Sequence, residues 1–244
     1  MLKKVLFAII LIVIISVLAI VIIKNYKGIL FHSVPWLIAS AFLIGFISGI
    51  LRGIRYNIYA QRSNDLLYRH NIDSFLEHWG TAVGIVILII SGYFILVGYN
   101  RFFSINLHFL GLIITLGFGI YFSTHFFISK KYKYLMPNIS DVINGTIKKY
   151  LFRVKWNDTG KYLSSQKTAF LVFSIMGIII SSTGAIKLAA YYYSVALQLT
   201  HIATQIHDIS ARLFVLVLII HILIAVVVSS NRRLLASFFY NKQK

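Results

Sequence analysis

The segment THIATQIHDISARLFVLVLIIHILIAVVVSS, Thr200 to Ser230, carries two histidines, His207 and His221. They are 14 residues apart, which at 100° per residue is about 40° short of four full turns, so both side chains project from nearly the same helix face. At about 1.5 Å per residue they lie ~21 Å apart along the axis, most of the ~30 Å hydrocarbon core of a bilayer. Imidazole is rare in a membrane-spanning segment. Two at this spacing suit a helix that gives one axial ligand to each of two hemes stacked across the membrane.

The composition is typical of a membrane protein. Hydrophobic residues make up 59% and charged residues only 12% of the 244 residues, and the mean hydropathy is +0.82, whereas about a quarter of a soluble domain is charged. The sequence therefore predicts an all-α integral membrane protein. The absence of cysteine excludes disulfides, cysteine-ligated iron–sulfur clusters and covalent c-type heme attachment within this chain. The net charge of +18 is more typical of basic loops at a membrane than of nucleic-acid binding.

Six apolar segments are long enough to cross a bilayer: residues 5–23, 35–51, 75–97, 104–128, 167–185 and 200–230. The first could be a signal peptide, but its apolar run is longer than the usual h-region of about 7–15 residues and no A-x-A-like site follows, which favours a retained helix. The very short link around Asn100 and Arg101 requires the third and fourth spans to be antiparallel neighbours.

We divide the chain into three parts: residues 1–69 with two spans and a connection, residues 70–235 with a four-helix bundle, and a tail of residues 236–244. Within the bundle part, residues 138–154 place apolar and basic side chains on opposite sides at helical spacing. The apolar ones are Val142, Ile143, Ile147, Tyr150, Leu151 and Val154, and the basic ones are Lys148, Lys149 and Arg153. This pattern predicts an amphipathic helix that lies on the lipid headgroups.

The distribution of lysine and arginine predicts the orientation. If the third span starts in the cytoplasm, the cytoplasmic segments include both termini and contain most of the 24 basic residues. The exceptions are Lys24, Lys27, Arg101 and Lys187 on the outer side and Arg212 inside the last span. Because short cytoplasmic loops collect Lys and Arg, we expect a multi-pass protein of the cytoplasmic membrane with both termini inside.

This topology assigns a depth to four histidines. His78 begins a helix that leaves the cytoplasmic side, and His108 begins one that enters from the outside. The last helix also enters from the outside, so His207 is near the outer face and His221 near the inner face. Two bis-histidine pairs result, His78 with His221 towards the cytoplasm and His108 with His207 towards the outside. We therefore predict two heme b groups with these four residues as ligands of the heme iron.

Gly92 and Arg212 are further candidates for heme binding. Gly92 lies 14 positions after His78 and on the same face, where it would let the outer macrocycle approach the third helix closely. Arg212, at membrane depth, could neutralise an outer heme propionate or form an ion pair with Asp208. We expect the remaining histidines to be non-ligands: His32 and His70 in connecting segments, His125 as an interfacial or polar-contact residue and His201 at the outer surface.

Several short motifs resemble one known family. They are Glu77-His78-Trp79 followed by Ser91-Gly92, Leu107-His108-Phe109-Leu110-Gly111, Gly160-Lys161-Tyr162 followed by Gln166-Lys167, and the paired His207 and His221. Over residues 70–235 the chain resembles the di-heme cytochrome b (gamma) subunit of respiratory formate dehydrogenases and membrane-bound nickel–iron hydrogenases. The resemblance implies a four-helix core that takes electrons from an attached iron–sulfur subunit of such a dehydrogenase or hydrogenase and passes them through two b hemes to menaquinone. The two extra N-terminal spans depart from the four-span version of the family.

The Gly160-Lys161-Tyr162 to Gln166-Lys167 element is expected beside the inner heme, at the cytoplasmic start of the fifth span. A quinone ring needs an apolar slot, hydrogen-bond donors near its carbonyls and a route for protons. We assign quinone binding to Gln166 and to His221 with its heme edge, with Lys161 and Lys167 as further donors and Ser164 or Ser165 in support. Alternatively, Lys167 and Tyr162 are ordinary interface anchors of a spanning helix.

Two other functions remain open. A quinol-oxidising cytochrome b that feeds an outer reductase would use the same four ligands. A transporter, from a different class, would line a proton or ion path with the membrane histidines and Arg212. The predicted outer side exposes little chain beyond the Asn100 link and residues 186–199, so a separate iron–sulfur subunit is expected to dock over residues 191–201.

Overall fold

The computed structural model describes residues 29–62, 72–158 and 162–227. The predicted first span, the predicted tail, His70 and Lys161 lie outside these residues. The described residues form two units, one with helices α2 to α4 up to Lys131 and one with α5 to α9 from Tyr132. Five helices are long and apolar enough to cross a membrane, and the described ranges contain no strand. The predicted all-α membrane fold class is confirmed.

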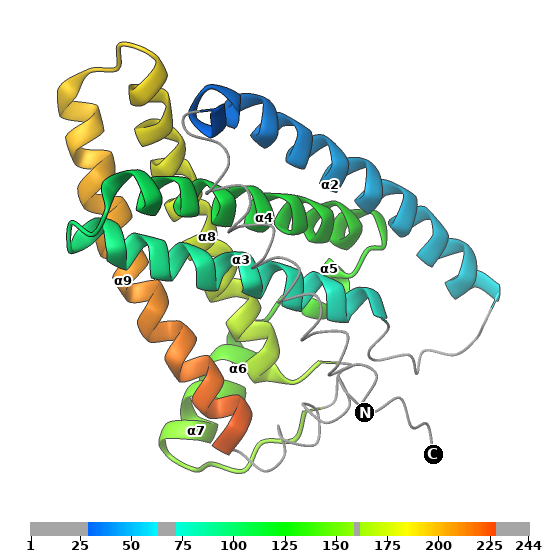
Figure 1. Ribbon diagram of the computed structural model, residues 1–244. Helices are drawn as coiled ribbons and strands as arrows, with labels where there is room; N and C mark the ends of the chain where they lie inside the picture. Colours follow the sequence, from blue (N-terminus) through cyan, green and yellow to red (C-terminus); the bar gives the residue numbers. More distant parts are fainter. Residues whose placement is uncertain (1–28, 63–71, 159–161, 228–244) are drawn as a thin grey trace. The chain divides into compact units, whose positions relative to one another are not determined.

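The first unit contains three long helices, α2 (Ile29–Arg62), α3 (Ile72–Leu96) and α4 (Arg101–Ile128). As predicted, α3 and α4 form an antiparallel hairpin (Figure 1). Its tight connection uses Gly98 at φ 70°, a left-handed conformation that glycine adopts without strain. Asn100 caps α4, because its Oδ1 accepts the backbone N–H of Phe103 at 3.2 Å.

Helix α2 packs against α4 through a row of glycines. Gly45, Gly49 and Gly53 face α4, and a Cβ at Gly45 would lie 2.4 Å from the carbonyl oxygen of Gly117. Such a contact is too short for any side chain, so these positions allow the two backbones to approach closely, as small residues do between membrane helices.

The predicted second span ends too early. Helix α2 continues beyond residue 51 to Arg62, because its polar extension still packs on α4. There, Asn57 Nδ2 donates to the carbonyl oxygen of Ile128 at 2.9 Å. At the other end, α2 begins before Pro35 and includes His32, so the prediction that His32 lies in a connecting segment was wrong.

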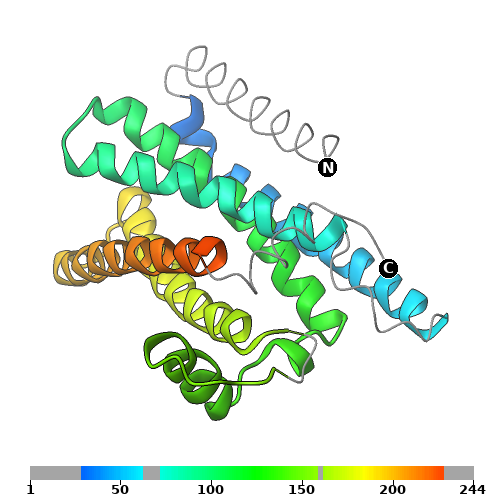
Figure 2. The same cartoon turned by 90° about the horizontal axis from the view of Figure 1, so that it is seen from below.

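The second unit is built around the hairpin of α8 (Ser164–Tyr192) and α9 (Leu197–Val227). The two helices lie side by side and meet at the short connection 193–196 (Figures 1 and 2). Helix α8 begins three residues before the predicted start at Lys167 and runs beyond residue 185 to include Lys187. The tyrosines at residues 191–193 therefore lie at the end of the helix.

The predicted amphipathic helix is present in altered form, after the single turn α5 (Tyr132–Leu135). It consists of α6 (Ile139–Val142), a π-helical stretch η1 (Ile143–Lys148) and α7 (Lys149–Leu151). Most of the predicted apolar set is exposed, namely Ile143, Ile147, Leu151 and Val154. The exposed stripe is Ile139, Ile143, Ile147 and Leu151, which are 42–79% exposed, whereas Val142 and Tyr150 are half-buried. The stripe retains the apolar surface that a lipid-facing helix needs.

Candidate functional site

His108 is held by a hydroxyl of the neighbouring helix. Ser91 of α3 is fully buried, and its Oγ lies 2.9 Å from His108 Nδ1. The Ser91 hydroxyl donates to the carbonyl oxygen of Ile87 at 2.7 Å, so its oxygen is left to accept from the imidazole. With the Ser91 hydrogen directed to Ile87 O or Leu88 O, we assign the proton of this contact to His108 Nδ1 and the lone pair to Nε2.

His207 has the same arrangement in the second unit. Thr183 of α8 donates its hydroxyl to the carbonyl oxygen of Ile179 at 2.8 Å, and its Oγ1 lies 3.1 Å from His207 Nδ1. The same Nδ1 lies 3.1 Å from the carbonyl oxygen of Ile180. A carbonyl oxygen can only accept, so His207 Nδ1 must donate and Nε2 carries the lone pair.

A glycine follows each of these hydroxyl residues. A Cβ at Gly92 would lie 3.9 Å from Cε1 of His108, and a Cβ at Gly184 would lie 3.3 Å from Cε1 of His207. The absence of a side chain leaves room beside both rings. A histidine that ligates a metal binds as a neutral imidazole and usually hydrogen-bonds its other ring nitrogen, and in His108 and His207 Nδ1 makes such a contact.

The other two predicted ligands are also on long helices. His78 is exposed near the start of α3 and contacts the Trp79 ring edge to face at 5.4 Å between centroids. His221 is half-buried on α9, and its ring meets Phe173 of α8 edge to face at 5.4 Å. The four histidines are thus divided equally between the two units.

Asp208, beside His207, forms a different ion pair from the one predicted with Arg212. Within the described part of the chain, Asp208 pairs with Lys187, with 3.5 Å between Oδ1 and Nζ, and no ion pair joins Asp208 to Arg212. Arg212 is exposed on α9. The interpretation of Arg212 as a partner of Asp208 therefore loses its support, and its role towards a heme propionate stays a prediction.

The first unit also contains a buried ionisable cluster of Glu77, His125 and Lys131. Glu77 Oε1 makes a very short contact with His125 Nδ1, and Lys131 Nζ lies 3.3 Å from Glu77 Oε2. His125 is 1% exposed, and the rings of Tyr56 and Tyr121 lie beside it. Of the two predicted alternatives for His125, the structure supports the polar-contact residue. Its partner Glu77 was quoted in a motif, but nothing in the sequence shows that residues 48 positions apart would meet.

The start of α8 is fixed by a second polar cluster, which we name the Ser164 cluster. It comprises Ser164, Asp141, Asp158, Lys149 and Lys167. The buried Ser164 hydroxyl lies 2.8 Å from Asp141 Oδ1 and 2.6 Å from Asp158 Oδ1. Lys167 pairs with Asp141 at 3.1 Å and Lys149 with Asp158 at 2.8 Å. Two carboxylates at the N-terminus of α8 interact favourably with the helix dipole. Because Asp141 of the amphipathic segment contacts Ser164 and Lys167 of α8, the cluster also anchors that segment to α8.

These contacts change the predicted roles of the quinone-site residues. Lys167 Nζ already donates to Asp141, and Ser164 is 2% exposed, so neither is presented as an open donor. Gln166 Oε1 accepts the backbone N–H of Leu163 at 3.0 Å, which caps α8 and commits the acceptor end of its amide. Ser165 accepts from the Tyr150 hydroxyl at 3.1 Å. Among the described residues, no hydrogen bond occupies the amide NH₂ of Gln166, so this predicted donor can make a further contact.

Acidification is expected to weaken the Ser164 cluster. Burial raises the pKa of Asp141 and of Asp158, but hydrogen bonds from the chain and from Ser164, together with Lys167 or Lys149, outweigh it, and both pKa values lie below the usual 3.8. A depressed carboxylate pKa stabilises the folded state above the unfolded pKa, and this stabilisation is lost as pH falls through the folded value. The midpoint temperature of thermal unfolding of the detergent-solubilised protein should therefore decrease when the pH is lowered below about 4.

Asp141→Asn is the matched control for this pH dependence. It keeps the side-chain shape but removes one titrating carboxylate, so the fall in the midpoint between about pH 5 and about pH 3 should be smaller than in the wild type. An equally large fall in the variant would show that the acid sensitivity arises elsewhere.

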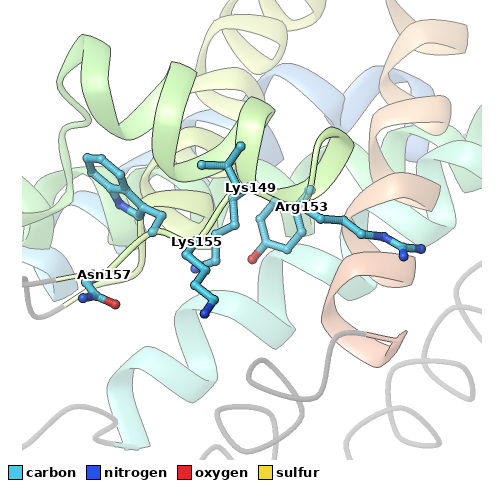
Figure 3. Close-up of a pocket in the computed structure, with 7 residues that line it drawn as sticks. Lys149, Arg153, Lys155 and Asn157 are labelled. Carbon is cyan, nitrogen blue, oxygen red and sulfur yellow. The ribbon is translucent and has the colours of Figure 1, made fainter.

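A basic cavity of about 410 Å³ lies at the end of the amphipathic segment (Figure 3). It is lined by Lys149, Tyr150, Arg153, Val154, Lys155, Trp156 and Asn157. None of the predicted heme or quinone residues lines it, so it belongs to the basic surface of the polar segment.

Comparison with curated proteins and with solved structures gives no match. The family described as prokaryotic cytochrome b561, which comprises cytochrome b subunits of nickel–iron hydrogenases and related oxidoreductases, matches residues 69–241. The match includes α3, α4, α8 and α9 with all four predicted ligands, and α2 precedes it. The chain therefore belongs to the prokaryotic cytochrome b561 family, whose members are membrane heme b electron-transfer subunits.

Proposed function

We propose that this chain is the membrane anchor of a respiratory oxidoreductase complex. It passes electrons between an outer iron–sulfur subunit of formate dehydrogenase or hydrogenase type and menaquinone near the cytoplasmic face. Two heme b groups are ligated by His78 with His221 and by His108 with His207. The observation that carries this proposal is that His108 and His207, assigned to one heme by depth alone, have the same hydrogen-bonded Nδ1 and the same adjacent glycine.

Heme b, when bound, supplies a one-electron ferric–ferrous couple. The chain's own part is to hold neutral imidazoles with Nε2 towards the iron, to surround them with apolar helix faces and to exclude water. Arg212 is the cationic candidate for an outer propionate. The family match supports this class of protein over a transporter, and both directions of electron flow use the same ligands.

A spectrum of the purified protein tests the proposal. The reduced-minus-oxidised difference should show b-type bands, and the heme content should be about two per chain, because two bis-histidine pairs are available. A membrane-inserted protein with no heme bands would refute the proposal.

We assign the quinone contact to the Gln166 amide. Because Oε1 caps Leu163, Gln166→Glu keeps the capping oxygen and removes the donor, whereas Gln166→Leu removes both. Both variants should slow reoxidation of the reduced hemes by a menaquinone analogue about tenfold, the effect of one hydrogen bond of about 1–1.5 kcal/mol. Stopped-flow absorbance in the α-band measures the rate, and Gln205→Glu on α9 is the control. Unchanged reoxidation in Gln166→Glu would exclude this contact.

The connection between α8 and α9 is the proposed docking surface for the iron–sulfur subunit. Apolar side chains in and beside this connection are strongly exposed: Tyr191 is 59%, Tyr193 75% and Leu197 85% exposed. Exposed aromatic and aliphatic residues at a membrane edge suit a protein partner. Leu197→Glu should reduce co-purification of that subunit, and full recovery of the complex would argue against docking here.

A further inference from the structure

The supports of His108 and His207 are alike although they come from different hairpins. In each, a buried hydroxyl residue is followed by glycine on the first helix, and a histidine of the second helix contacts the hydroxyl. The dipeptides are Ser91-Gly92 on α3 and Thr183-Gly184 on α8. Both hydroxyl residues are almost inaccessible, at 0% and 7% exposure.

The hydroxyls are themselves held in place. Ser91 donates to Ile87 O and Thr183 donates to Ile179 O, each four residues earlier on its own helix. Because this bond uses the hydroxyl hydrogen, the oxygen is directed to the imidazole as an acceptor. A hydrocarbon side chain of similar size would fill the space but could not accept a hydrogen bond from Nδ1–H.

An acceptor at Nδ1 has two effects on a ligating histidine. It selects the tautomer with Nε2 free and fixes the ring plane, and it makes the imidazole a stronger electron donor. A stronger donor stabilises ferric over ferrous iron and so lowers the reduction potential. His207 has two acceptors, Thr183 Oγ1 and Ile180 O, so the loss of the Thr183 hydroxyl alone leaves it partly supported.

We propose that Ser91 and Thr183 are paired positioning residues that orient His108 and His207 on the outer heme and hold its potential low. This inference rests on the proposed function and adds to it two residues, one from each hairpin, that act on the same iron.

The test compares Ser91→Ala, Thr183→Val and Thr183→Ser in the purified full-length protein. Potentiometric titration followed in the α-band, together with low-temperature EPR of the ferric hemes, resolves the two hemes. In Ser91→Ala the ferrous-to-ferric ratio of the outer heme at fixed potential should rise about 2- to 10-fold, the range of one net hydrogen bond. Thr183→Val should move the same heme by less, and Thr183→Ser should restore wild-type behaviour. The inner heme should not change.

Three results would overturn the inference. Unchanged potentials and EPR in a fully loaded Ser91→Ala protein would show that the hydroxyl only packs. If Ser91→Ala does not assemble, unchanged potentials and EPR in the Thr183→Val protein would overturn the inference in the same way. If Ser91→Ala and Thr183→Val changed the reduction potentials of different hemes, His108 and His207 would not bind the same iron. A wild-type protein without heme would instead refute the proposed function itself, so the two failures are distinguishable.

Discussion

His207→Ala is expected to leave one heme per chain, and His108→Ala should remove the same heme. Alanine has no group that can bind iron, so each change deletes one axial bond of the outer pair. His78→Ala and His221→Ala should each remove the other heme. Heme content per chain and potentiometry of the heme that remains measure the outcome. The heme that remains should have the same reduction potential in the His207 and His108 variants, and a different one in the His78 and His221 variants.

The control is His201→Ala on the same helix as His207. His201 is exposed, and its Nε2 contacts Gln205 at 3.1 Å, so both hemes should be retained. If the heme retained in His78→Ala had the same reduction potential as the heme retained in His207→Ala, the predicted topology of the spans would be wrong.

His125→Ala is expected to keep both hemes but to destabilise the protein by roughly 3 kcal/mol, the cost of leaving a buried charge without one of its partners. The change removes the imidazole that contacts Glu77, and Lys131 at 3.3 Å remains as the second partner. Thermal unfolding in detergent measures the loss, and heme content is determined on the same sample.

The double variant Glu77→Gln/His125→Ala separates charge from packing. With the carboxylate replaced by a neutral amide, part of the lost stability should return, because the buried charge that lost one of its two partners is gone. Loss of a heme in His125→Ala would make this residue a ligand and contradict its assignment. An unchanged thermal midpoint in His125→Ala would contradict a stabilising role of the buried contact between Glu77 and His125.

The spans could be predicted because a long apolar run has few alternatives to a membrane helix. Of the six predicted, five correspond to described helices, and the first lies outside the described residues. The ends were less predictable. Helix α2 continues to Arg62 and α8 to Tyr192, and a tertiary contact accommodates a polar side chain in each added part, Asn57 with Ile128 O and Lys187 with Asp208. The π turns of η1 were missed because sequence spacing assumes one uniform helix period.

The residues that support the candidate site could not be predicted for a different reason. Ser91 was quoted only as part of a motif, and Thr183 was not singled out, because a hydroxyl in an apolar helix usually bonds to its own backbone. Both do so, and their second contact depends on which helix packs beside them. Asp141 and Ser164 are 23 residues apart, with no local pattern to connect them. The repeated Ser/Thr-Gly pair followed by a histidine on the next span was the available clue.

If the two proposed hemes lie at the levels of His207 and His221, the uninterrupted helix α9 fixes the fraction of the membrane's electrical thickness that separates them. No proline lies between the two residues, so ~21 Å of axis, about two-thirds of a ~30 Å core, separates their levels. An electron that passes between these levels crosses the same fraction of the voltage drop, and a membrane potential of about 100 mV changes its energy by about 1.5 kcal/mol. The ratio of electrons on the two proposed hemes would then shift about tenfold for each 100 mV of membrane potential.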